Sequence, residues 1–212
     1  MLRRVKIDDL IGVLDTGLRT VFQVNQAERP YPASQTMNEP PLAPSDKKAS
    51  AAYMRVNHAG EIAAQALYQG QKITAREASV KTAMAKAGKE EIDHLVWCEL
   101  RLAELNSHPS YLAPLWFTGA FMLGALAGMA GDRWSLGFLA ETEAQVVAHL
   151  EGHLKCLPAN DEVSRTVIRQ MSIDEAAHAE EAIKNGGVGL PLPLRYLMRI
   201  TARVMTTVAY YI

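Results

Sequence analysis

The chain has 212 residues, of which 49% are hydrophobic and 21% charged, and its formal net charge is −1. These values predict one folded domain and exclude a disordered or low-complexity chain. Since a nucleic acid is held by an excess of basic residues, we expect no nucleic-acid partner. Only two cysteines, Cys98 and Cys156, are present, which excludes a disulfide framework and favours a reducing compartment. The basic N-terminal residues are followed by Asp8 and Asp9 and not by an uninterrupted apolar stretch, so we expect no secretory signal.

The predicted elements are all helical. Apolar residues at three- and four-residue steps predict an amphipathic helix at the start, and a proline-rich loop is expected between residues 26 and 48. Asn106 to Ser110 and the glycines from Gly186 mark helix ends. The expected helices span about residues 7–24, 49–77, 79–106, 132–157, 161–185 and 190–212, and residues 111–131 form a stretch without charge.

No run of alternating apolar and polar residues indicates a strand, so the fold class is all-α. Four long helices are typical of a bundle. We expect an N-terminal helix and loop in residues 1–48, a four-helix bundle in 49–189 that contains the apolar insertion 111–131, and a C-terminal amphipathic helix in 190–212.

Two Glu-x-x-His pairs carry the chemical signal. Glu91 precedes His94 by three residues, and Glu175 precedes His178 by the same step. In a helix, residues three apart lie about 4.5 Å apart along the axis on nearly the same face, so both can reach one metal ion. The alternative is that these residues lie on the solvated surface, as most glutamates do.

A lone glutamate precedes each pair by about one helical hairpin. Glu61 lies 30 residues before Glu91, and Glu143 lies 32 residues before Glu175. Antiparallel neighbouring helices would therefore bring all four carboxylates to one height. One Glu from each of two helices, with Glu-x-x-His from the other two, is typical of ferritin-like bundles that bind two iron or manganese ions. We expect Glu61, Glu91, His94, Glu143, Glu175 and His178 to be the metal ligands.

Three further acidic residues adjoin these ligands. Asp174 lies four residues before His178 and is predicted to hydrogen-bond an imidazole N–H of its own or a neighbouring helix. Asp93 is a candidate for the same role, although its angular position is poor. Glu90 lies four residues before His94, and we expect it to be an exposed charge.

The strings Val56-Asn57-His58-Ala59-Gly60-Glu61, Glu91-Ile92-Asp93-His94-Leu95, Thr142 to His149 and Asp174 to His178 resemble the demethoxyubiquinone hydroxylase family of ubiquinone biosynthesis, over roughly residues 45–212. The resemblance implies a ferritin-like di-iron monooxygenase with two iron ions per chain. Its substrates would be O2 and a polyprenylated demethoxybenzoquinol, whose ring it hydroxylates at a membrane face. The same six ligands are implied by position.

The resemblance also implies a proton or electron relay at His149. Six residues correspond to about 240° around a helix, so His149 does not share the face of Glu143. Family members can carry Tyr after this histidine, whereas here Leu150 follows it. Of the other histidines, we expect His58 in a structural turn contact, and His108 and His153 at the surface.

Two apolar segments indicate a membrane. Residues 111–131 carry no charge, and residues 190–212 carry Arg195, Arg199 and Arg203 at four-residue steps without an acidic residue. Pro114 and several glycines argue against a full crossing, so we expect both segments to lie on one leaflet, with the arginines toward phosphates. The alternatives are burial in the bundle or a dimer interface for the first, and docking on the bundle for the second.

We therefore expect a peripheral protein at the cytoplasmic face of a membrane, the bacterial inner membrane, that contacts lipid and forms a homo-oligomer. Other ubiquinone-biosynthesis proteins are expected partners. No Gly-x-Gly-x-x-Gly string is present, so the reductant stays open between a nicotinamide bound in another way, a partner protein and the quinol itself. The competing functions are iron storage in a ferritin-like bundle and a structural, metal-free membrane protein.

Overall fold

The structure is a computed structural model that describes residues 7–33 and 41–212. Residues 1–6 and 34–40, and with them part of the predicted proline-rich loop, lie outside the described residues. Every regular element in the described ranges is an α-helix, which confirms the predicted all-α class. The helices are α1 Ile7–Val21, α2 Pro44–Thr74, α3 Ala78–Glu104, α4 Ala113–Met129, α5 Asp132–Cys156, α6 Glu162–Lys184 and α7 Leu192–Tyr211.

The helix ends follow local chemistry. α2 begins at Pro44, five residues earlier than the alanine-rich pattern indicated, because proline suits the first turn, where its missing N–H has no helical partner. α6 begins after Asp161, whose carboxylate accepts a hydrogen bond from the Ser164 N–H at 2.8 Å. Gly186 follows α6 with a φ of +97°, which glycine adopts without strain.

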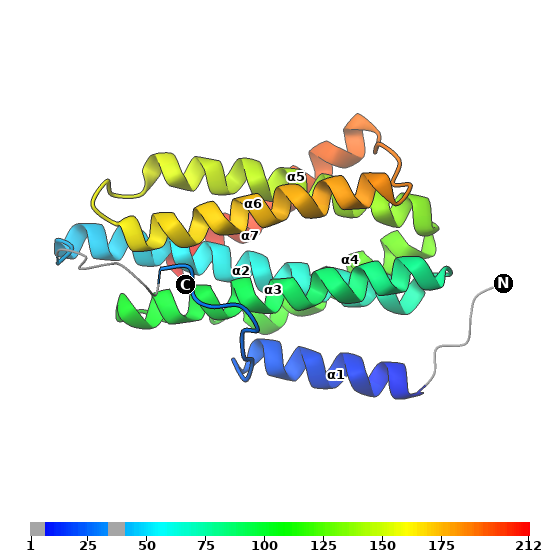
Figure 1. Ribbon diagram of the computed structural model, residues 1–212, viewed down its shortest axis with the longest axis horizontal. Helices are drawn as coiled ribbons and strands as arrows, with labels where there is room; N and C mark the ends of the chain where they lie inside the picture. The colour runs from blue at the N-terminus through cyan, green and yellow to red at the C-terminus, as the bar shows by residue number, and fades with distance from the viewer. Residues whose placement is uncertain (1–6, 34–40) are drawn as a thin grey trace.

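Helices α2, α3, α5 and α6 lie along the long axis of the molecule (Figure 1) and share their apolar side chains in two core clusters. One cluster joins Met54, Trp97, Leu150 and Met171 from the four helices. The other joins their opposite halves. Both clusters are apolar and buried, so the four helices form a bundle that is held together at two separate heights.

The second cluster contains Tyr68, Met84, Leu139 and Ala182. On α2 and α5, the residues between the two clusters include Glu61 and Glu143; on α3 and α6 they include both Glu-x-x-His pairs. The bundle therefore presents a polar layer between two apolar layers.

α4 packs closely on α2. A Cβ on Gly124 would collide with the backbone oxygen of Leu67, and a Cβ on Gly70 would collide with the backbone oxygen of Phe121. Small residues let these two backbones approach each other, as they do between helices in membranes. The remaining face of α4 is exposed, including Met122 and Leu126. α4, which forms most of the charge-free stretch 111–131, therefore has one face packed on α2 and the other face exposed.

α1 and α7 are attached to the outside of the bundle. α1 lies along one outer side (Figure 1), with Gly17 against Phe117 and with Ile7, Ile11, Leu14 and Leu18 exposed. α7 docks on α2 and α5, and exposes apolar residues such as Leu197 and Val204.

Among the described residues, no helix is both long enough and apolar enough to cross a membrane.

Candidate metal centre

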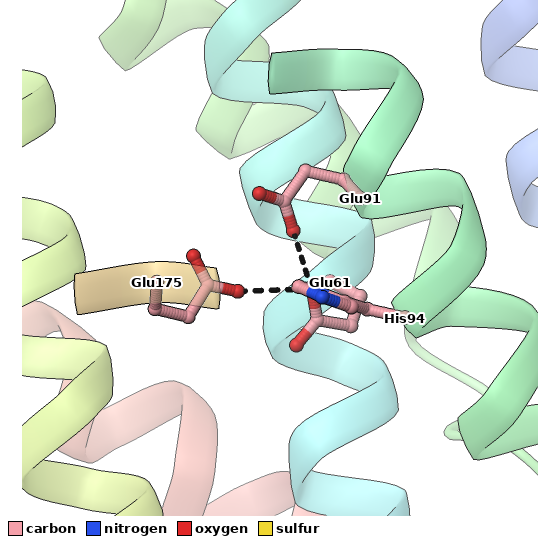
Figure 2. Close-up of side chains that lie close together, drawn as sticks. All are labelled: Glu61, Glu91, His94 and Glu175. Atoms are coloured by element: carbon pink, nitrogen blue, oxygen red, sulfur yellow. Dashed lines mark ion pairs between the residues drawn. The ribbon is translucent and has the colours of Figure 1, made fainter. Parts of the chain in front are cut away.

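The polar layer brings three carboxylates around the imidazole of His94. Its Nδ1 lies 3.0 Å from Glu175 Oε1, 3.4 Å from Glu91 Oε2 and 3.7 Å from Glu61 Oε2. Figure 2 shows the side chains converging from α2, α3 and α6. All four residues are buried, and one ligand atom of each lies within 4.8 Å of the others, which is a spacing that fits a metal ion.

His178 completes this arrangement from the other side. Its Nδ1 lies 3.1 Å from Glu175 Oε2 and 3.2 Å from Glu91 Oε1. Glu91 and Glu175 thus each present one oxygen to His94 and the other to His178. Carboxylates that bridge two positions in this way are the donor arrangement that a two-metal site requires.

Glu143 lies at the same height on α5, and 1% of its surface is exposed. Tyr68 donates a hydrogen bond from its hydroxyl to Glu143 Oε1 at 2.7 Å, which fixes the carboxylate in the bundle. Glu143 Oε2 has no hydrogen-bond partner among the described residues. Glu61 and Glu143 therefore supply one further carboxylate from each of the two remaining helices.

Burial opposes charge on these glutamates. It raises the pKa of Glu61 and of Glu143 well above the usual value, and the neighbouring carboxylates of Glu91 and Glu175 raise both further. Burial also acts on Glu91, but the nearby imidazoles of His178 and His94 outweigh this and lower its pKa. The layer holds more acid than it can ionise without a cation.

The histidines respond in the opposite sense. Burial lowers the pKa of His94, but the hydrogen bond with Asp174 and the nearby carboxylate of Glu175 outweigh it and raise the pKa well above its usual value. His178 behaves alike: burial lowers its pKa, while Glu175 and Glu91 raise it to about 12. Since metal ions compete with protons for these atoms, metal binding here releases protons.

A carboxylate also contacts the Nε2 atom of each imidazole. Asp174 Oδ2 lies 2.9 Å from His94 Nε2, on the neighbouring helix, which is one of the two placements that the sequence predicted. Glu90 Oε2 lies 2.6 Å from His178 Nε2, so the prediction that Glu90 is only an exposed charge is wrong. Each imidazole is thereby oriented with Nδ1 toward the bridging carboxylates.

Asp93 acts through another residue. Its carboxylate accepts hydrogen bonds from the Arg29 Nε at 2.6 Å and from the backbone N–H of Glu28 at 2.7 Å. Arg29 in turn donates to Asp174 Oδ2 at 2.8 Å. Arg29 could not be singled out from the sequence, because it lies in the loop before α2, where nothing in the local pattern connects it to the helices.

The remaining histidines lie elsewhere in the fold. The edge of the His149 ring meets His153, with ring centroids 4.0 Å apart, and its Nε2 has no hydrogen-bond partner among the described residues. His153 is 7% exposed and its Nδ1 lies 2.8 Å from Asn57 Oδ1, so its predicted surface position is wrong. His108 is exposed as predicted, and His58 is buried within α2 rather than in a turn.

The residues fit a metal. Both oxygens of Glu91 and the Nδ1 of His94 are buried without a hydrogen-bond partner among the described residues, so their lone pairs face the centre of the layer. Oxygen with imidazole nitrogen is the donor set of iron, manganese and similar first-row ions. A helical bundle with this layer defines the class of carboxylate-bridged, ferritin-like metal proteins.

Comparison with known proteins gives the family. The model of the ubiquinone biosynthesis protein COQ7 family matches residues 48–209. This chain belongs to that family. It is 52% identical over 206 residues to the 3-demethoxyubiquinol 3-hydroxylase of Polynucleobacter necessarius subsp. necessarius, which covers 97% of this chain and 99% of that protein. It is also 52% identical over 211 residues to the enzyme of the same name from Nitrosococcus oceani, covering 99% of this chain and 98% of that protein.

Proposed function

We propose that this protein hydroxylates the ring of 3-demethoxyubiquinol, using O2, in ubiquinone biosynthesis. The observation that carries the proposal is the buried layer in which Glu91 and Glu175 each face both His94 and His178. Membership in the COQ7 family supports the same activity, as does similarity over almost the whole chain to proteins named 3-demethoxyubiquinol 3-hydroxylase.

We assign two iron ions to this layer, held by Glu61, Glu91, His94, Glu143, Glu175 and His178. Such ions, when bound and reduced, supply the electrons and the coordination positions with which O2 is activated. The chain's own residues supply the geometry. Glu91 and Glu175 set the spacing of the two positions, and Tyr68 holds Glu143 in place.

The surroundings of the layer keep the reaction dry. The two apolar core clusters close it above and below within the bundle. Asp174 and Glu90 accept the Nε2–H of the two imidazoles, so that each Nδ1 is free to ligate. For His149, a role in proton or electron transfer toward the quinol stays part of the proposal, supported by its half-buried position and its unpartnered Nε2.

The test is a single turnover, which avoids the question of the natural reductant. Iron-loaded protein is reduced without oxygen and mixed with a short-chain demethoxyquinol and O2. The mass of the product is then measured by mass spectrometry. We expect a quinol heavier by one oxygen atom. Glu143→Ala and Glu175→Ala should lose about two bound irons and the product together, whereas Glu151→Ala, an exposed glutamate on α5, should lose neither.

Iron storage is the second candidate, because it uses the same ligands. Bound iron without product would favour storage. A chain that binds no iron would favour the third candidate, a structural membrane protein.

We further propose that the protein is peripheral to a membrane, at the cytoplasmic face, with lipid in contact with α1, α4 and α7. The exposed apolar residues on these helices support this, as do the exposed Arg199 and Arg203. Arg195 takes another role, since its Nε lies 2.6 Å from Glu141 Oε2 and holds α7 on α5. Other biosynthetic proteins or a second copy of the chain are the competing occupants.

Vesicle sedimentation tests this part. Binding should be stronger to vesicles with anionic phospholipid than to neutral ones. The double variant Arg199→Ala/Arg203→Ala should weaken it by about 30-fold, since each basic residue near the surface contributes about 1 kcal/mol. Arg169→Ala on α6 is the matched control. A protein that ignores anionic vesicles and stays monomeric without detergent would contradict the membrane proposal.

A further inference from the structure

We propose that Arg29 is a positioning residue for the His94 side of the metal centre, so that the segment before α2 is an integral part of that centre. The inference rests on the proposed function only in that iron is taken as the metal. It concerns a residue outside the four bundle helices, in a segment that precedes the matched family region of residues 48–209.

Arg29 directly contacts the groups around the Nε2 of His94. Arg29 donates from Nη1 to Asp174 Oδ2 at 2.8 Å, and Asp174 Oδ2 is the same oxygen that lies 2.9 Å from His94 Nε2. Arg29 Nη2 itself lies 3.2 Å from His94 Nε2. The guanidinium therefore binds the carboxylate that orients His94 and lies against the edge of that imidazole. Its planar fork donates to Asp93 through Nε and to Asp174 through Nη1 at once, which a lysine ammonium cannot do in the same geometry.

The segment that carries Arg29 is held in place at several points. Asp93 accepts from the Nε of Arg29 and from the backbone N–H of Glu28. The guanidinium carbon lies 4.7 Å from the ring centroid of Trp97, which is a cation–π distance. Ala33, a few residues on, is buried in the first core cluster. The position of Arg29 thus follows from the fold and is not that of a free surface side chain.

Arg29 also places a positive charge beside Asp174. A carboxylate that accepts a hydrogen bond from a ligating imidazole increases the basicity of that ligand and favours the more highly charged metal ion. Because Asp174 shares its oxygen with Arg29, this effect is reduced at His94. His178 is paired with Glu90, and among the described residues Glu90 forms no ion pair with an arginine or lysine. Arg29 therefore makes the two metal positions unequal.

The test uses iron-loaded protein with two readouts, an anaerobic redox titration and the Mössbauer spectrum. Arg29→Ala should move one of the two reduction steps to a more negative potential and change one of the two iron signals, leaving the other as it was. It should also weaken one of the two iron-binding steps by about 10- to 100-fold. Arg29→Lys should give a smaller change in the same direction, since it keeps the charge and loses the fork.

Asp93→Asn removes the main anchor of Arg29 and should reproduce the Arg29→Ala signature, and the double variant should go no further. Arg19→Ala is the control, an exposed arginine of α1 whose side chain pairs with Asp15. If Arg29→Ala fails to fold, the same redox and Mössbauer measurements on Arg29→Lys test the inference. Equal changes at both irons, or no change, would overturn the inference.

The two proposals fail separately. Absence of hydroxylated product with a one-sided change in the iron signals would overturn the proposed function and leave the role of Arg29 standing. Hydroxylated product with iron signals that Arg29→Ala does not alter would do the reverse. A protein that binds no iron would overturn both.

Discussion

Two pairs of histidines lie inside the same bundle, and their pKa values are shifted in opposite directions. His94 and His178 lie among carboxylates, and both pKa values are raised. His149 and His153 contact each other, and burial lowers the pKa of His149 and lowers that of His153 to about 3. Burial disfavours charge in all four, so the neighbouring groups decide the outcome.

The surroundings of His94 and His178 favour a bound cation, whereas those of His149 and His153 favour neutral imidazoles. In the first, each imidazole has carboxylates at both nitrogens. In the second, His153 has an amide oxygen of Asn57 at one nitrogen and the ring of Tyr53 at 4.7 Å. The first pair is suited to hold metal, and the second pair is suited to stay uncharged.

The largest effect should come from removing a carboxylate that both metal-side histidines share. Glu91→Gln keeps the size of the side chain and removes its charge, so both imidazoles lose a partner at once. We expect the affinity for both irons to fall by more than about 100-fold. A carboxylate shared by both metal positions contributes more to the affinity than residues that only hydrogen-bond the ligands. Anaerobic iron titration measures this.

In the same variant without iron, the pKa of His178 should fall from about 12, which makes the first pair resemble the second. Histidine NMR over a pH range measures it. Glu151→Gln on the exposed face of α5 is the control. Unchanged histidine titration would show that Glu91 is not the carboxylate that separates the two pairs.

A smaller effect should distinguish the two outer carboxylates. Asp174→Asn should weaken iron binding by about 10- to 100-fold, as is usual for the partner of a ligating histidine. Glu90→Gln should cost less, because the Glu90 side chain is 35% exposed and that of Asp174 is 13% exposed, so water can replace the lost hydrogen bond at His178. Equal losses in iron titrations of the two variants would contradict the order.

The sequence predicted the helices and the layer because both depend on periodicity. Helices begin and end close to the expected positions where glycine or a capping aspartate marks them, whereas α2 begins five residues early, at Pro44. The spacing between Glu61 and Glu91, and between Glu143 and Glu175, predicted that they would meet at one height. The structure places all six predicted ligands in the layer between the two core clusters.

The contacts made across the sequence could not be predicted in this way. Glu90 and Arg29 reach histidines 88 and 65 residues away, and no local pattern specifies such pairs. His153 resembles a surface residue because it lies near the end of a helix rich in polar residues. It is buried because Tyr53 of α2 packs against it. Leu150 likewise fills the first core cluster, where its apolar side chain packs among the four helices.

The smallest effect concerns the neutral pair and the response of stability to acid. His153 has a pKa of about 3 in the folded chain against 6.5 ordinarily, so below about pH 6.5 the unfolded chain binds a proton that the folded chain does not. Folding stability is therefore unaffected by His153 at higher pH and falls as the pH drops from about 6.5 toward 3. At pH 5 the loss is about 2 kcal/mol.

Urea unfolding at pH 7 and pH 5, with chelator present, measures this term as a difference. His153→Gln stays neutral at both values and can still donate a hydrogen bond to Asn57, so the fall in the free energy of unfolding between them should shrink by about 2 kcal/mol. Any loss that does not depend on pH cancels in this difference. His108→Gln, at an exposed position, should leave the fall unchanged. If His153→Gln keeps the whole fall, the acid response belongs to the carboxylate layer, and the neutral pair does not contribute to it.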